Sequence, residues 1–212
     1  MNTVVKIEDV SVIIRKHVIL EHINLEMEPG KIYGFVGRNG SGKTVMMKCI
    51  CGFMPATSGE ITVNGKRIGK DCDFPPDTGV IIETPEFLPY LSGYQNLKTL
   101  ANMKQKIHKP EIEATMDLVG LDPKLKRQVR KYSLGMRQRL GLAQAIMENP
   151  SLLVLDEPMN GLDKHGVADM RRYLLQLKEQ GKTIIIASHS TEDISVLCDE
   201  TYEFEDCCIH KL

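Results

Sequence analysis

The chain has 212 residues, of which 42% are hydrophobic and 26% are charged, as is ordinary for a folded domain with a continuous core. Its formal net charge of −1 creates no overall field that would recruit nucleic acid or an anionic membrane surface. Met1–Asp9 lacks the features of a secretory signal, and apolar runs such as Leu152–Leu155 are far shorter than the roughly 20 residues of a membrane helix. We therefore expect one cytosolic domain, residues 1–212, that reaches a membrane only through a partner.

The six cysteines are expected to be reduced thiols rather than a disulfide framework, because the chain shows no secretory signal. Cys49 and Cys51 lie two positions apart on a predicted helix, which points their side chains in different directions and disfavours a metal site. Cys207 and Cys208 are expected in a terminal turn.

The first predicted elements are strands. Val4–Ile7, Val10–Ile14 and Ile23–Met27 alternate apolar and polar residues, which favours a half-exposed antiparallel sheet. Lys31–Gly37 is then predicted to be a buried strand that runs into a glycine-rich turn. A helix follows from about Lys43 to Cys51.

A hairpin is predicted at Gly59–Ile68, because the pair Asn64-Gly65 suits a tight turn between two short strands. After a strand at Gly79–Ile82, the pattern becomes helical and is interrupted by Pro and Gly. The predicted helices of this region are Gly93–Lys106, Pro110–Val119 and Ser133–Met147.

The remaining chain alternates between strand and helix. The predicted order is strand Leu152–Leu155, helix Lys164–Gln180 and strand Thr183–Ala187, with a last strand at Thr201–Glu205. Crossover units of this kind are typical of a parallel sheet. We therefore expect an α/β fold with a mainly parallel core sheet, an N-terminal antiparallel β subdomain and a helical subdomain inserted at about residues 84–150.

A phosphate-binding loop is predicted where the buried strand meets the first helix. Its glycines let backbone amides surround phosphates, and the following helix adds its positive end. The loop matches the pattern G-x-x-x-x-G-K-[ST], in which Lys43 reaches the β- and γ-phosphates and the Thr44 hydroxyl is suited to bind Mg²⁺. Its residues are Gly37, Arg38, Asn39, Gly40, Ser41, Gly42, Lys43 and Thr44. By itself, the pattern does not separate a kinase, a GTPase or a motor.

Two acids and a histidine follow the buried strands that are predicted to lie beside this loop. Asp156 is suited to hold Mg²⁺, and Glu157 to orient or deprotonate an attacking water. The pair also fits a simple cap of the next helix. His189 follows the next buried strand and, as a neutral imidazole, bridges donors and acceptors around a γ-phosphate, although a lone histidine in a fold is usually structural.

Together with Tyr132-Ser133-Leu134-Gly135-Met136, these motifs resemble the nucleotide-binding domain of ABC transporters over essentially the whole chain. The pentapeptide, here called the signature segment, occupies the slot of the LSGGQ-like signature of that family. Gly161-Leu162-Asp163 matches the family's D-loop, and His189 matches its switch histidine. The resemblance implies the P-loop NTPase fold and the use of ATP and Mg²⁺.

The resemblance also implies how such a subunit works. Two copies, or this chain and a similar ATPase, would close around two ATP molecules, each held between the phosphate loop of one subunit and Ser133, Gly135 and Met136 of the other. Asp163 would contact the nucleotide site through the D-loop. Hydrolysis would reset the pair and drive a separate membrane permease. That permease is expected to dock near Glu83–Asn96.

This sequence departs from the family pattern at two places. Glu83 stands where the family usually has a glutamine, and we expect its carboxylate to face Mg²⁺ and alter metal affinity, unless it is an ordinary surface residue. Together with the Tyr-Ser-Leu-Gly-Met signature, Glu83 makes this sequence resemble the bacitracin-resistance and lantibiotic-immunity branch of exporters. Ile14-Arg15 replaces the usual adenine-stacking aromatic residue, which predicts that GTP competes with ATP.

Two other functions remain open from the sequence. A non-transport ABC ATPase of the chromosome-maintenance or translation type would carry a long coiled coil or a second such domain, and neither occurs here. A catalytically idle regulatory subunit would keep ATP binding, but Glu157 and His189 favour turnover. Because the chain ends soon after its last predicted strand, we expect no appended regulatory domain.

Overall fold

Two sheets organise the computed structural model, which describes residues 3–212; the side chain of Lys104 is also outside the description. Met1 and Asn2, the start of the segment in which no secretory signal was expected, lie outside the described residues. The elements in chain order are β1 (Val5–Ile14), β2 (His17–Met27), β3 (Ile32–Val36), α1 (Lys43–Ile50), β4 (Ser58–Val63), β5 (Lys66–Arg67), β6 (Thr78–Ile81), α2 (Gly93–Lys104), α3 (Lys109–Leu118), a 3₁₀ turn (Val129–Lys131), α4 (Leu134–Ile146), β7 (Leu152–Asp156), α5 (Lys164–Glu179), β8 (Thr183–Ala187), α6 (Thr191–Leu197), β9 (Glu200–Glu205) and β10 (Cys208–Lys211).

The core sheet has six strands in the order β10-β9-β3-β8-β7-β6, and all its pairings are parallel except that of β9 with β10. Its central strands β7 and β8 are buried along their whole length. Alternate residues face opposite sides, so Leu153 packs with the helical lobe while its neighbour Val154 packs with α1 and the N-terminal sheet. Burial on both faces explains the continuous apolar runs and confirms the predicted α/β fold.

The N-terminal sheet has the order β2-β1-β4-β5. The sequence analysis was wrong to divide its first strand, because Val5–Ile14 is one strand with a bulge near Asp9, which has φ 51°. It also began the second strand too late: β2 starts at His17, in a mostly exposed stretch where apolar alternation is weak. The predicted hairpin at Gly59–Ile68 is confirmed, since Asn64 and Gly65 both have positive φ, as a type I′ turn requires.

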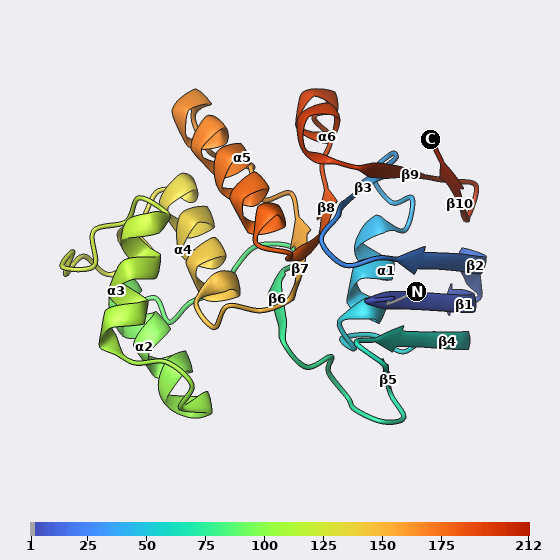
Figure 1. Ribbon diagram of the computed structural model, residues 1–212, viewed down its shortest axis with the longest axis horizontal. Helices are drawn as coiled ribbons and strands as arrows, with labels where there is room; N and C mark the ends of the chain where they lie inside the picture. The colour runs from blue at the N-terminus through green and yellow to red at the C-terminus, as the bar shows by residue number, and fades with distance from the viewer. Residues whose placement is uncertain (1–2) are drawn as a thin grey trace.

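The helices α2, α3 and α4 form a lobe on one side of the core sheet, and α1 with the N-terminal sheet lies on the other side (Figure 1). Ser92 and Gln95 form a capping box that fixes the start of α2. The three predicted helices of this region are present: α2 and α4 are slightly shorter than predicted, and α3 is shifted by one residue. Among the described residues, no helix is both long and apolar enough to cross a membrane.

Two C-terminal elements were missed. The short helix α6 lies between β8 and β9, with Ser190 accepting a hydrogen bond from the Asp193 amide at its start. The expected terminal turn at Cys207 and Cys208 is only half right: Asp206 and Cys207 form the turn, and Cys208 begins β10. The described cysteines are free thiols.

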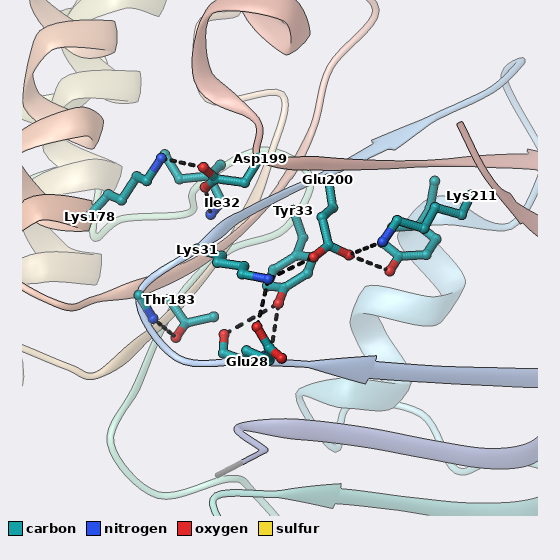
Figure 2. Close-up of polar contacts among 11 residues, drawn as sticks. Glu28, Lys31, Ile32, Tyr33, Lys178, Thr183, Asp199, Glu200 and Lys211 are labelled. Atoms are coloured by element: carbon teal, nitrogen blue, oxygen red, sulfur yellow. Dashed lines mark hydrogen bonds and ion pairs between the residues drawn. The ribbon is translucent and has the colours of Figure 1, made fainter. Parts of the chain in front are cut away.

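Ion pairs fix the amino end of β3 to the C-terminal strands (Figure 2). Lys31 contacts Glu28 at 2.6 Å and Glu200 at 2.9 Å, and Lys211 reaches the other oxygen of Glu200 at 2.8 Å. The Tyr202 hydroxyl donates to Glu200 at 2.9 Å. The strand that leads into the phosphate loop is thus held at its start by contacts with β9 and β10.

Candidate functional site

The phosphate loop, Gly37–Thr44, connects the carboxyl end of β3 to α1, as predicted. Two of its glycines have positive φ and no room for a side chain. A Cβ on Gly37 would lie 2.5 Å from the Phe204 carbonyl oxygen, and one on Gly42 would lie 2.8 Å from Leu20. Gly42 is also the N-cap of α1, and no side chain caps that helix within the described residues. The first amides of α1 are therefore open to an anion.

Lys43 lies over the loop from which it projects. Its ammonium donates to the carbonyl oxygens of Gly37 at 2.7 Å and Arg38 at 3.0 Å. Burial lowers the pKa of Lys43, while the nearby carboxylates of Glu157 and Asp156 act in the opposite direction. Among the described residues, this buried cation is held by carbonyl dipoles and influenced by nearby acids, so it is well prepared to receive a phosphate.

Thr44 and Asp156 meet although they are far apart in the sequence. The Thr44 hydroxyl donates to Asp156 Oδ2 at 2.8 Å, and Asp156 is buried at the end of β7. A hydroxyl beside a carboxylate forms the start of the hard-oxygen donor set that Mg²⁺ prefers. Both residues therefore fit the predicted metal role by donor chemistry.

Glu157 and His189 are brought together at the same edge of the sheet. Glu157 Oε1 lies 3.4 Å from His189 Nε2, and the histidine side chain is half exposed. The Glu157 backbone has φ 49° and is fixed by its amide, which donates to the Ala187 carbonyl oxygen at 3.0 Å. Burial raises the pKa of Glu157, and the neighbouring His189 partly offsets this effect. This geometry matches a base and its positioning partner more closely than a helix cap.

Two buried side-chain polar atoms lack a hydrogen-bond partner within the described part of the chain. They are Ser41 Oγ in the phosphate loop and Glu157 Oε1 at the end of β7. Because nearly all buried polar groups in folded proteins are paired, such atoms mark places completed by water or a ligand. Both belong to the predicted nucleotide site.

The signature segment starts α4, where Ser133 is the N-cap and its hydroxyl accepts from the Met136 amide at 3.2 Å. Gly135 lies against the D-loop, because a Cβ there would be 2.9 Å from the Gly161 carbonyl oxygen. Asp163 caps α5 by accepting from the Gly166 amide at 2.8 Å. The helix α4, which follows Ser133, and the helix α1, which follows the phosphate loop, lie on opposite sides of the core sheet (Figure 1).

The two unusual positions lie at turns with left-handed backbone. Glu83 has φ 60°, and its exposed carboxylate forms an ion pair with Lys48 on α1. Arg15 and Lys16 form the tip of the hairpin between β1 and β2, with φ 50° and 69°. Ile14 packs partly against the N-terminal core. Of this pair, Arg15 is therefore the side chain with more freedom.

Sequence reasoning missed several residues around Glu157 and His189. Gln138, buried on α4, donates to the Glu157 carbonyl oxygen at 3.2 Å and joins the helical lobe to the end of β7. Arg171 on α5 is paired with acids of α6. For Gln138, a polar residue on a buried helix face is the sequence signal that could have been used. For Arg171, the contacts depend on how α5 and α6 pack.

A family model described as "ABC transporter" matches residues 20–160, which includes the phosphate loop, the signature segment and Glu157. The chain belongs to the ABC transporter family. The ABC transporter ATP-binding proteins are ATPases, and the chain is an ATP-binding member of this family. The resemblance inferred from its motifs is confirmed.

The chain is similar to curated proteins from several bacteria. It is 44% identical to the uncharacterized ABC transporter ATP-binding protein YybJ of Bacillus subtilis, over 90% of this chain and 87% of that protein. It is 39% identical to the bacitracin transport ATP-binding protein BcrA of Enterococcus faecalis, over 94% of this chain but 65% of BcrA. It is 37% identical to the lantibiotic transport ATP-binding protein SrtF of Streptococcus pyogenes, over 92% of this chain and 83% of SrtF.

Solved structures share the fold. An ATP-binding subunit of an ABC transporter superposes with a TM-score of 0.88 at 25% identity, covering 99% of this chain and 90% of that chain. The ATP-binding cassette MJ0796, described as a dimer in a post-hydrolysis state bound to ADP and Pi, gives 0.87 at 20% identity with 98% coverage of both chains. The expected P-loop NTPase architecture of the ABC type is thus confirmed.

Proposed function

We propose that this ABC protein hydrolyses ATP as one of a pair of subunits and drives a separate membrane permease. The observation that carries the proposal is the pair of buried atoms without a hydrogen-bond partner among the described residues, Ser41 Oγ and Glu157 Oε1, beside the open amides at the start of α1. A triphosphate in the loop with its attacking water would complete both.

Each residue of the loop region then has a role. The open amides at the start of α1 and the Lys43 ammonium bind the β- and γ-phosphates. Thr44 and Asp156 hold Mg²⁺, which supplies charge neutralisation on the phosphate oxygens when bound. Arg38, Asn39 and Gly40 form the exposed outer turn of the loop.

Glu157 acts as general base, since its partly buried carboxylate has a raised pKa and is therefore a stronger base than an exposed one. His189, 3.4 Å away, orients that carboxylate and contacts the γ-phosphate.

The second half of the nucleotide site comes from a second ATP-binding subunit. Ser133, Gly135 and Met136 lie at the start of α4, whose positive end favours an anion, and α4 lies across the core sheet from α1 (Figure 1). Leu134 beside them is half exposed, as a contact residue would be. Gly161 and Leu162 of the D-loop pack against this segment, so the D-loop with Asp163 would enter the same interface.

The permease docks beside Glu83–Asn96. Leu88 and Tyr90 in this segment are exposed, and so are the nearby aromatic residues Phe53 and Phe74, whose rings lie 6.0 Å apart. Exposed apolar side chains of this size are typical of an interaction surface. Docking would place the protein at the inner face of the cell membrane.

We further propose export of a peptide antibiotic or similar compound, supported by the similarity to BcrA and SrtF and by Glu83. GTP is expected to compete with ATP, since Arg15 or Ile14 provides a weaker platform for the base than an aromatic ring. A nucleotide-competition assay that finds strong preference for ATP would contradict this selectivity.

The central experiment compares wild-type protein with Glu157→Gln. Wild type should release phosphate from Mg-ATP, and the variant should lose turnover by about 10²-fold or more, while forming an ATP-dependent dimer in sedimentation. Glu179→Gln, an exposed position at the end of α5, is the matched control and should behave as wild type. A wild type without turnover would identify an idle subunit, and a variant that stays monomeric in saturating Mg-ATP would exclude the shared site.

A further inference from the structure

A closed set of hydrogen bonds surrounds the loop that carries His189. Ser188 Oγ donates to Asp193 Oδ2 at 3.2 Å and accepts from the Ser190 amide at 3.1 Å. Ser190 Oγ in turn accepts from the Asp193 amide at 3.2 Å. Both neighbours of His189 are therefore bound to Asp193. The backbone position of the histidine depends on where this aspartate lies.

Asp193 is itself held by an arginine from another helix. Arg171 on α5 places Nε 2.7 Å and Nη2 2.5 Å from Asp193 Oδ1, and Nη1 2.9 Å from Glu192 Oε1. Asp193 is 3% exposed, so its charge depends on the arginine for compensation. A planar guanidinium binds both acids in one orientation, which a lysine does not reproduce.

The arginine faces the same hollow as the reacting groups. A cavity of about 650 Å³ is lined by Glu157 and His189 and also by Arg171, Asp193 and the D-loop residue Leu162. The helix that carries Arg171 begins at Lys164, directly after the D-loop, whose last residue Asp163 is the N-cap of the helix. A continuous path thus leads from α5 through Asp193 and the two serines to His189, 3.4 Å from Glu157.

We propose that Arg171 is a positioning residue for ATP hydrolysis, which holds His189 against Glu157 through Asp193, Ser188 and Ser190. This inference rests on the proposed hydrolysis at Glu157. Because α5 follows the D-loop, the same path makes the position of His189 sensitive to D-loop movement at the subunit interface. Since the guanidinium of Arg171 is engaged by Asp193 and Glu192, Arg171 would act on turnover rather than on ATP binding.

The test is a double-mutant cycle between Arg171→Met and His189→Ala. Arg171→Met should lower kcat by roughly 10- to 100-fold, the usual effect of losing a residue that orients a reactive group, with KM for ATP within about twofold. Adding it to His189→Ala should produce no further loss, since both changes remove the same function. Arg171→Lys should retain an intermediate kcat.

Arg172→Met is the matched control. Arg172 is the next residue on α5, its side chain is 70% exposed, and it pairs with Asp169, three residues earlier on the same helix, at 2.7 Å. The Arg172→Met variant should leave kcat unchanged. Fully multiplicative losses in the Arg171→Met/His189→Ala protein would overturn the proposal, because they would show that Arg171 acts independently of His189.

A readout without turnover separates positioning from general destabilisation. The NMR signals of the His189 ring should shift in Arg171→Met and Ser188→Ala protein and stay in place in Arg172→Met. Ser188→Ala removes one hydrogen bond of the path and leaves no buried charge unpaired, so it stays informative if Arg171→Met does not fold. An unchanged His189 signal together with an unchanged kcat in the Ser188→Ala protein would overturn the proposal. If His189→Ala lowers kcat but folded Arg171→Met does not, the positioning role fails and the proposed function stands. If wild type shows no hydrolysis, the proposed function itself fails.

Discussion

Thr44 Oγ1 donates a hydrogen bond of 2.8 Å to Asp156 Oδ2, and this contact joins the helix after the phosphate loop to the end of a strand 112 residues away. It brings the two expected oxygen donors for Mg²⁺ to one point. The parallel register explains it, because β3 and β7 both pair with β8 and end at the same edge.

Replacing Thr44 by valine, which has nearly the same shape, should remove the Mg²⁺ dependence of ATP binding. The variant should also lose about 1 kcal/mol of unfolding free energy, since Asp156 loses a hydrogen-bond donor. Calorimetric titration of ATP with and without Mg²⁺ measures the first effect, and urea unfolding measures the second. Thr99→Val, on the exposed face of α2, is the control, and equal Mg²⁺ enhancement in both variants would contradict the metal role.

Turnover should depend on pH through Glu157. The base works when ionised, and burial raises its pKa, so kcat should fall with decreasing pH earlier than it would for an ordinary carboxylate. A pH profile of kcat under saturating Mg-ATP measures this limb. A profile that is flat down to the ordinary carboxylate range would be inconsistent with Glu157 as the base.

The same raised pKa has an opposite consequence for stability. Because the folded state binds the Glu157 proton more tightly than the unfolded state, unfolding free energy falls as pH rises from the ordinary glutamate pKa through the raised one. Glu157→Gln should therefore raise Tm at neutral pH, and the gain should vanish at acid pH where both proteins are neutral at this position. Thermal unfolding at both pH values gives the comparison.

Glu200 should make the free energy of unfolding fall as pH decreases, which is opposite to the effect of Glu157. Hydrogen bonds from Lys211 and Lys31 lower the pKa of Glu200 to about 2 (Figure 2). Its contribution to stability is complete above the usual glutamate pKa and is lost as pH falls from there toward about 2. Glu200→Gln should cost roughly 1 to 3 kcal/mol at neutral pH, because two lysines lose their anion.

The measurement for Glu200 is urea unfolding of wild type and variant between pH 7 and pH 2. The difference in unfolding free energy should shrink below the ordinary glutamate pKa. Glu205→Gln, exposed at the end of the same strand, serves as control and should show no such difference. A constant difference across the range would mean that the ion pairs are not its source.

The ion pair between Glu83 and Lys48 should control how Glu83 reaches a metal. Glu83→Gln, which restores the usual family residue, should raise the Mg²⁺ concentration needed for half-maximal turnover, and Lys48→Met should lower it by releasing the carboxylate. Neither should change stability by more than about 1 kcal/mol, since Glu83 is exposed. Identical Mg²⁺ titrations for wild type and Glu83→Gln would show that Glu83 is not a ligand.

The sequence by itself determined the local features of this protein. Local features depend on backbone conformation and on the burial of near neighbours, and both follow from consecutive residues. Examples are Gly37 and Gly42, the apolar runs of β7 and β8, and the Asn64-Gly65 turn. For this reason the strand-to-helix loop at Gly37–Thr44 and the polar ends of the buried strands, at Asp156 and at His189, are predictable from the sequence.

Only the tertiary structure decided which distant side chains meet. The contacts of Arg171 with Asp193, Gln138 with Glu157 and Lys48 with Glu83 join separate elements, and no spacing in the sequence encodes them. The same holds for α6 and the bulged β1, whose exposed residues show little periodicity. The physical reason is that such pairs form when packing of the sheet and helices sets the distance between elements, which depends on the whole core rather than on the residues in contact.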